Sequence, residues 1–100
     1  MCDLKNQNLE NAEYFGYTAQ SNQLIEECAE LIQAVSKYRR AEVKTEDEKM
    51  IALANLVEEL ADVEIMIEQI KYLLQVPDED ILALKQYKVN RTKERIAGRG

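Results

Sequence analysis

The chain has 100 residues, of which 46% are hydrophobic and 32% charged, and its formal net charge is −6. This size predicts a single domain over residues 1–100, and the composition is too apolar for a disordered protein. The acidic balance argues against a nucleic acid polymer or an anionic membrane as the partner. No apolar run is long enough to cross a bilayer, and the first ten residues, MCDLKNQNLE, lack the apolar stretch of a signal peptide. We therefore expect a cytoplasmic protein.

The residue types favour an all-α fold of about four helices. Glycine and proline are scarce, at three and one residues, and most of the abundant residue types are good helix formers. We expect helices over about 4–14, 18–41, 45–75 and 78–97, with a break near Gly16 in an aromatic cluster. The capping-box spacing that begins at Thr45 starts the third helix, Pro77 ends it, and Gly98 is expected to end the fourth.

The second and third helices carry apolar stripes that are typical of helix–helix packing. Apolar residues recur at spacings of four and three over 24–38 and again over 53–74. The few residues between the two helices predict an antiparallel two-helix core. Because so short a chain leaves apolar surface uncovered, we expect a homodimer or homotetramer that completes a helical bundle.

Two pairs of carboxylates occupy matching positions beside these stripes. Glu27 and Glu30 each precede a stripe residue on the second helix, as Glu59 and Asp62 do on the third. Equivalent flanks of antiparallel helices face each other, so we expect the four side chains to converge at the edge of the core. Either pair alone is compatible with a solvated helix face. Together, their mutual repulsion favours a shared hard cation, and oxygen ligands without histidine indicate Mg²⁺ or Mn²⁺.

The pattern Glu26-Glu27-x-x-Glu30 followed by Glu59-x-x-Asp62 resembles the MazG-like all-α nucleoside triphosphate pyrophosphohydrolases, which are related to dimeric dUTPases and phosphoribosyl-ATP pyrophosphohydrolase. The stretches IEECAELIQAVSKYRR and NLVEELADVEIMIEQI resemble the two motif helices of that family. The resemblance spans about residues 22–96. It implies Mg²⁺-dependent hydrolysis of an NTP or dNTP to the monophosphate and pyrophosphate, for nucleotide-pool sanitation or control.

The same resemblance assigns roles to the acidic residues. The four acids of the two pairs become the metal ligands: Glu27, Glu30, Glu59 and Asp62. Glu26 and Glu27 are the candidates for catalysis. Glu26 and Glu58 lie one step further from the stripes, where each either faces solvent or serves as a base that orients the attacking water, with Glu26 the better candidate.

The last stretch of the chain is basic although the chain as a whole is acidic. KVNRTKERI, residues 88–96, resembles the family's C-terminal stretch that contacts phosphates or sugar. The resemblance implies four substrate contacts there: Lys88, Asn90, Arg91 and Arg95. Three of these are cations that share one helical face, and arginine recognises phosphate through paired hydrogen bonds. Cations near a helix C-terminus are also favoured without any ligand, and Lys37 and Arg40 are alternative phosphate contacts.

Two departures from the family pattern bear on substrate and activity. Met66 stands where some members have an aromatic residue one turn after the final acid, so the base pocket is not defined. The chain has no histidine, whereas phosphoribosyl-ATP pyrophosphohydrolases have one after the second acidic motif. That activity is therefore the less favoured enzymatic alternative. A non-enzymatic helical oligomerisation module and a nucleotide-binding module without turnover are the other readings that the sequence leaves open.

Overall fold

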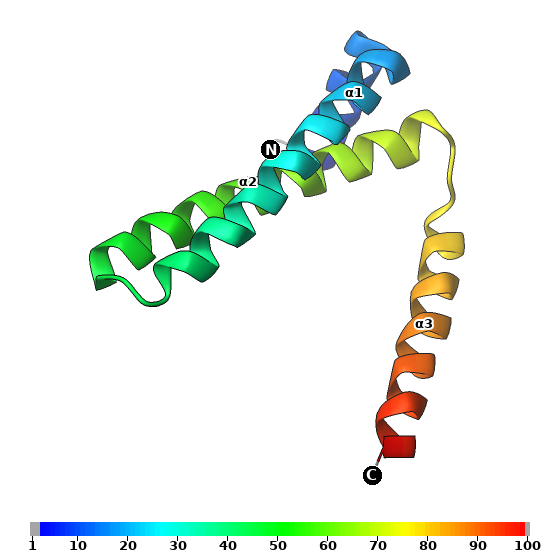
Figure 1. The fold of residues 1–100 in the computed structure, drawn as a ribbon. Coiled ribbons are helices and arrows are strands. Elements are labelled where there is room, and N and C mark those ends of the chain that lie inside the picture. The colour runs from blue at the N-terminus through cyan, green and yellow to red at the C-terminus, as the bar shows by residue number, and fades with distance from the viewer. Residues whose placement is uncertain (1–2, 100) are drawn as a thin grey trace.

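The computed structural model describes residues 3–99, and these residues form an all-α fold. Its helices are α1 (Leu4–Ala41), α2 (Glu46–Leu73) and α3 (Asp78–Arg99) (Figure 1). α1 and α2 pack together as an antiparallel hairpin joined by residues 42–45, whereas α3 extends away from them. The all-α class and the antiparallel two-helix core predicted from the sequence are confirmed.

The break predicted near Gly16 lies inside α1. Gly16 has φ 85° and ψ 172°, a backbone conformation that is essentially restricted to glycine. The chain turns there, and the N-terminal arm (residues 4–15) lies beside the C-terminal half of α2 (Figure 1). Residues 3–99 thus form three helices where four were expected, and the two helical segments that flank the non-helical Gly16 together make up α1.

Local sequence accounts for most of the helix ends. Thr45 caps α2, and its side-chain oxygen accepts a hydrogen bond from the backbone N–H of Glu48 at 3.2 Å. α2 ends at Leu73, after which Gln75, at φ 56°, and Pro77 redirect the chain. The prediction that Gly98 ends the last helix is wrong, because α3 continues through it to its final described turn. An exposed last turn tolerates glycine, since little packing depends on it.

A buried network of amides holds the N-terminal arm against the hairpin. Asn8, Gln20 and Gln69 are each at least nine-tenths buried. Asn8 Nδ2 donates to the backbone oxygen of Ile65 at 3.1 Å and to the carboxylate of Glu68 at 2.9 Å. Gln69 Nε2 donates to Asn8 Oδ1, and Gln20 Nε2 donates to Gln69 Oε1, both at 2.7 Å. Because buried amides are costly unless they are paired, this network fixes the register of the arm on α2.

The apolar stripes do not fill the interior of the hairpin. Few apolar residues are buried among those described, and most of them are alanines: Ala12, Ala34, Ala41, Val63 and Met66. Several stripe residues remain close to half exposed, with Val35 at 42%, Leu60 at 43% and Ile67 at 46%. The stripes, which were expected to pack the helices together, are therefore only partly buried, since Val63 is covered and these three residues are not.

Helix rotation explains where the stripes lie instead. The α1 residues directed at α2 recur every seven positions: Gln20, Glu27, Ala34 and Ala41. These four residues mark the line along which α1 contacts α2. Because successive residues are rotated by about 100° around the helix axis, the stripes of both antiparallel helices lie on the same side of this contact line. We call this side the apolar face; its members are Leu24, Cys28, Leu31 and Val35 of α1 and Leu53, Leu60, Ile67 and Leu74 of α2. Glu30 and Asp62 fall on the opposite side, which we call the carboxylate face.

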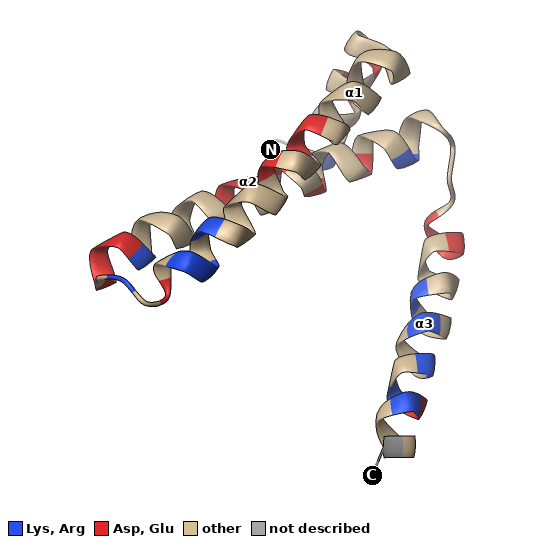
Figure 2. Ribbon diagram, in the orientation of Figure 1, with Lys and Arg blue, Asp and Glu red and all other residues tan. Residues whose placement is uncertain are grey.

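α3 stands apart from the rest of the described chain. Within residues 3–99, it packs on neither α1 nor α2. Its first residue, Asp78, forms an ion pair with Lys71 of α2 at 2.9 Å, and this partner lowers the pKa of the Asp78 carboxyl. Residues 82–98 of α3 are exposed, and their charged residues are predominantly basic (Figure 2).

Candidate metal centre

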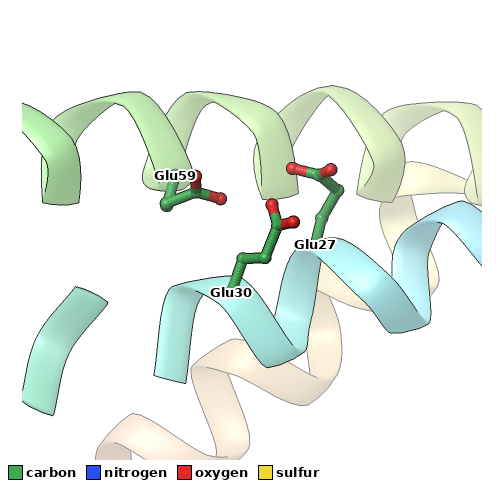
Figure 3. A group of neighbouring side chains, drawn as sticks. All are labelled: Glu27, Glu30 and Glu59. Carbon is green, nitrogen blue, oxygen red and sulfur yellow. The ribbon is translucent and has the colours of Figure 1, made fainter. Parts of the chain in front are cut away.

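Three of the predicted ligands converge in the middle of the hairpin. Glu27 and Glu30 project from α1, and Glu59 projects from α2 toward them (Figure 3). One carboxylate oxygen from each of the three lies within 4.8 Å of the others. A spacing of three residues puts Glu27 and Glu30 on one side of α1, and antiparallel packing brings Glu59 opposite. We call these three residues the carboxylate cluster.

The fourth predicted ligand, Asp62, adjoins the cluster without joining it. Asp62 is half-buried and lies against Glu27, but its oxygens are not among the three that converge. Glu27 has a further neighbour that was not predicted: Gln23 Nε2 donates to Glu27 Oε1 at 2.9 Å. Gln23 precedes Glu27 by four residues, and this helical spacing is the signal that could have identified the contact.

The cluster contains buried acceptor atoms that lack a donor. One oxygen of Glu27 and one of Glu59 are buried and have no hydrogen-bond partner among the described residues. Buried polar atoms are almost always paired, because removing an unpaired acceptor from water is costly. A cation between the two helices would satisfy both oxygens, which supports the prediction of a metal site.

The dimensions of the cluster suit a divalent cation. Bonds of about 2.1 Å from Mg²⁺ to oxygen place opposite ligands of an octahedron about 4.2 Å apart. The converging oxygens, within 4.8 Å, would each move by less than about 1 Å to reach that separation. Donors that are all carboxylate oxygens match hard cations such as Mg²⁺ and Mn²⁺.

Burial and like charges raise two carboxyl pKa values in the cluster. For Glu27, burial is the main cause of the raised pKa, followed by its contact with Asp62, while the hydrogen bond from Gln23 opposes the shift. For Glu59, burial again raises the pKa most, followed by the negative charges of Glu30, Glu27 and Asp62. The metal-free fold therefore disfavours full ionisation here, and a bound cation would reverse that preference.

The two remaining acids of the motifs are not part of the cluster. Glu26 and Glu58 are exposed, and neither belongs to the converging group. Glu26 is one residue from Glu27, so it lies at the rim of the site rather than inside it. Its role in orienting water stays a prediction.

A single chain does not bring the predicted substrate contacts to the carboxylates. These residues all lie on the exposed surface of α3: Lys88, Asn90, Arg91 and Arg95. The Arg91 guanidinium lies 5.8 Å from the centre of the Tyr87 ring, and Gln86 Nε2 donates to Asn90 Oδ1 at 3.1 Å. Figure 2 shows the separation, with acids in the middle of the hairpin and basic residues along α3.

A cationic recess lies toward the loop end of the hairpin. Its volume is about 500 Å³, and Lys37, Arg40 and Lys44 line it. Two of these cations already have partners, since Arg40 donates to Ser36 Oγ at 2.8 Å and Lys44 lies 3.9 Å from the Glu48 carboxylate. The recess includes the alternative phosphate contacts named from the sequence.

An amide recess lies on the other side of the cluster, between the N-terminal arm and α2. Its volume is about 510 Å³. Amides line it together with two carboxylates, two large apolar side chains and one alanine: Gln7, Asn8, Asn11, Gln69, Glu64, Glu68, Leu4, Ile65 and Ala61. This recess could not be predicted from the sequence, because it depends on the turn at Gly16 that lays the arm along α2.

Comparison of the chain with protein-family models, curated proteins and solved structures finds no match. None of the helices described over residues 3–99 combines the length and the apolar character that a membrane span requires. Function is therefore inferred from the chemistry and geometry of the site.

Proposed function

We propose that the protein is a Mg²⁺-dependent nucleoside triphosphate pyrophosphohydrolase that converts an NTP or dNTP to the monophosphate and pyrophosphate. The observation that carries this proposal is the convergence of Glu27, Glu30 and Glu59 from two helices, with unpaired buried oxygens on two of them. The resemblance of the motif spacing to MazG-like enzymes supports the same activity.

The residues divide the chemical work between them. Mg²⁺ held by the carboxylate cluster would neutralise phosphate charge and acidify or orient a water molecule. Asp62, against Glu27, is positioned to complete the ligand set or to orient one of its members. Glu26, at the rim, is positioned to accept a hydrogen bond from the water that adds across the α–β anhydride.

The amide recess favours a nucleotide over a simple polyphosphate. Amide side chains offer donors and acceptors that match the edge of a nucleobase. Ile65 follows Glu59 by six residues, so this part of the recess lies about 9 Å from the cluster along α2. A nucleoside in this recess would leave its phosphates at the carboxylates.

Assembly of identical chains is part of the proposal. The apolar face of the hairpin is uncovered, and a homodimer or homotetramer would bury it as a helical bundle. We place the protein in the cytoplasm, where it would sanitise or control the nucleotide pool.

The test is product analysis with a panel of common ribo- and deoxyribonucleoside triphosphates in the presence of Mg²⁺. We expect pyrophosphate and the monophosphate from at least one of them. Glu59→Gln should abolish turnover while far-UV circular dichroism shows retained helix, and Glu79→Gln, an exposed acid of α3, should retain turnover.

Three results would contradict the proposal: no pyrophosphate from any nucleotide, orthophosphate as the product, or normal turnover by Glu59→Gln. Absence of turnover with retained nucleotide binding would favour the binding module, and absence of both would favour an oligomerisation module. Phosphoribosyl-ATP belongs in the panel, so that the histidine-biosynthesis alternative is decided in the same assay.

A further inference from the structure

The cationic recess continues the carboxylate face toward the loop end of the hairpin. Lys37 follows Glu30 by seven residues, which is two turns further on the same side of α1 and about 10 Å along it. On α2, Asn55 lines the recess and precedes Glu59 by four residues, so it lies one turn from the cluster, about 6 Å along the helix. The cluster and the recess are therefore neighbours on one face of the hairpin.

Positive charge in this recess is available to a ligand. Three cations line it against one carboxylate, that of Glu48, and this acid is already paired with Lys44. Lys37 takes part in none of the ion pairs found within residues 3–99. Arg40 uses one N–H group for its bond to Ser36, and a guanidinium carries five. Lys37 and Arg40 therefore keep donors for an anion.

The other end of the cluster offers amides in place of cations. Toward the N-terminal arm, its neighbours include Gln20, Gln23 and Gln69. On α2 the first cation in that direction is Lys71, which lies about 18 Å along the helix from Glu59 and is engaged in an ion pair. A chain of phosphates that meets the cluster is thus attracted toward the loop and not toward the arm.

We propose that the cationic recess binds the terminal phosphates of the substrate through Lys37 and Arg40, so that the polyphosphate runs from the carboxylate cluster toward the hairpin loop. The direction follows from the uneven distribution of charge along the carboxylate face. That the anion is part of a nucleotide rests on the proposed function. The flexible four-carbon stem of Lys37 carries its ammonium back toward the cluster, where the β- and γ-phosphates lie. The nucleoside is then at the opposite end, toward the amide recess.

This direction makes triphosphates the preferred substrate class over diphosphates. Water adds to the α-phosphorus and releases a proton to Glu26 or to solvent, while the bond from that phosphorus to the bridging oxygen breaks. The oxygen leaves with the β- and γ-phosphates as pyrophosphate. Cations beside the leaving group bind both of its phosphates and stabilise the negative charge that it gains. A diphosphate releases only orthophosphate, which is too short to engage both cations.

A calorimetric titration with the Mg²⁺ complex of inorganic pyrophosphate tests the recess without any nucleotide. Wild type is compared with the double variant Lys37→Gln/Arg40→Gln, and far-UV circular dichroism checks that both retain their helices. Because hydrogen bonds between ionised partners are the strong ones, we expect the Kd of the variant to rise by about 10–100-fold. A rise of less than about tenfold, or no binding by wild type, would overturn the proposal.

A matched control removes two positive charges from the same end of the hairpin but from its other face. Arg39 lies beside Val35, and Lys49 precedes Leu53 by one turn; both neighbours belong to the apolar face. Arg39→Gln/Lys49→Gln therefore changes the net charge equally, and we expect its Kd for Mg²⁺-pyrophosphate to stay within about threefold of wild type. An equal loss of affinity in the two double variants would indicate general electrostatic attraction and would overturn the assignment of the recess.

Lysine footprinting locates the anion in the wild-type chain, so it does not depend on the folding of a variant. Mg²⁺-pyrophosphate should slow the acetylation of Lys37, followed by mass spectrometry of its peptides, and should leave the acetylation of Lys49 unchanged. Equal protection of the two lysines, or no protection of Lys37, would overturn the placement.

Turnover then separates this proposal from the proposed function. If no nucleotide is hydrolysed but pyrophosphate binds through Lys37 and Arg40, the proposed function fails and the recess stands. If nucleotides are hydrolysed, we expect Lys37→Gln/Arg40→Gln to lower kcat/KM for the triphosphate by about 10–100-fold and for the matching diphosphate by less than about threefold. Wild-type kcat/KM for the triphosphate in this variant would overturn the recess and leave the proposed function standing.

Discussion

Glu27→Gln should raise the free energy of unfolding when no divalent cation is present, and it should reduce the stabilisation that a divalent cation provides. Without metal, Glu27 is a half-buried carboxylate with one unpaired buried oxygen and with two other carboxylates close by. The substitution keeps the oxygen that accepts from Gln23 and removes the charge. With metal, the same charge is a ligand, and its removal weakens binding. A purely structural role for Glu27 predicts destabilisation in both conditions.

The distances set the size of the metal-free effect. Glu27 and Glu30 have oxygens within 4.8 Å of each other, and two charges at that limit repel by about 3.5 kcal/mol at an effective dielectric constant of 20 and by about 0.9 kcal/mol in water. Because both groups are partly exposed, we expect a net gain of about 1–2 kcal/mol in the variant. For a domain of this length, each kcal/mol raises Tm by about 4–8 °C.

The effect of metal follows from mass action. Mg²⁺ at one hundred times its Kd stabilises the wild type by about 2.7 kcal/mol, which corresponds to a rise in Tm of about 10–20 °C. The variant should show a much smaller rise. The assay is a thermal melt followed by circular dichroism, at fixed protein concentration, in EDTA and along a Mg²⁺ titration, with Glu79→Gln as the control. If Glu27→Gln melts below wild type in EDTA, or if Mg²⁺ raises both equally, the reasoning is refuted.

Three further predictions concern backbone, network and pH. Gly16→Ala should lower the free energy of unfolding by about 1–3 kcal/mol, because alanine disfavours φ 85° even though the added methyl group meets no neighbour. The control Gly98→Ala, in α3, should be neutral or slightly stabilising. Urea melts of the two variants and the wild type measure the difference. Gln69→Leu should cost about 2–4 kcal/mol, because it leaves Asn8 Oδ1 and Gln20 Nε2 buried without their partner, and hydrogen exchange should show the N-terminal arm loosening first. Without metal, the free energy of unfolding should fall as pH rises from about 4.5 through the raised pKa values of Glu27 and Glu59. In that range the folded chain holds protons that the unfolded chain has already released. Urea melts between pH 4 and 7 should show this fall, and saturating Mg²⁺ should abolish it.

Local chemistry made the helices and the cluster predictable. Thr45 and Pro77 act on their own neighbours, and Gly16 adopts a conformation that few other residues tolerate, so their effects are visible in the sequence. The convergence of acids from two helices followed from their equal phase beside the stripes. Periodicity alone therefore predicted that Glu27 and Glu59 lie close together.

The rotation of the helices could not be predicted in the same way. Spacings of three and four identify an apolar stripe, but they do not say whether that stripe faces the partner helix or another chain. In the structure the contact line runs through Gln20, Glu27 and Ala34, and stripe residues such as Leu60 are left uncovered. The rotation of the helices about their axes also leaves Asp62 beside the cluster and not within it.

The directions of the N-terminal arm and of α3 also could not be predicted from the sequence. The Asn8–Gln69 contact joins residues 61 positions apart, and it exists only because the turn at Gly16 lays the N-terminal arm on α2. The departure of α3 depends on the backbone of Gln75, for which no local pattern gave a sign. These two features define the amide recess and separate the basic residues from the acids.

The central claim is that the carboxylate cluster binds a divalent cation, and a Mn²⁺ titration followed by electron paramagnetic resonance tests it most directly. Wild type and the double variant Glu27→Gln/Glu59→Gln are compared without nucleotide at equal concentration, and the free-ion signal reports binding. We predict about one Mn²⁺ bound per wild-type chain, displaced by Mg²⁺, and loss of this binding in the variant. Equal uptake by both proteins, or no uptake by wild type, would contradict the account.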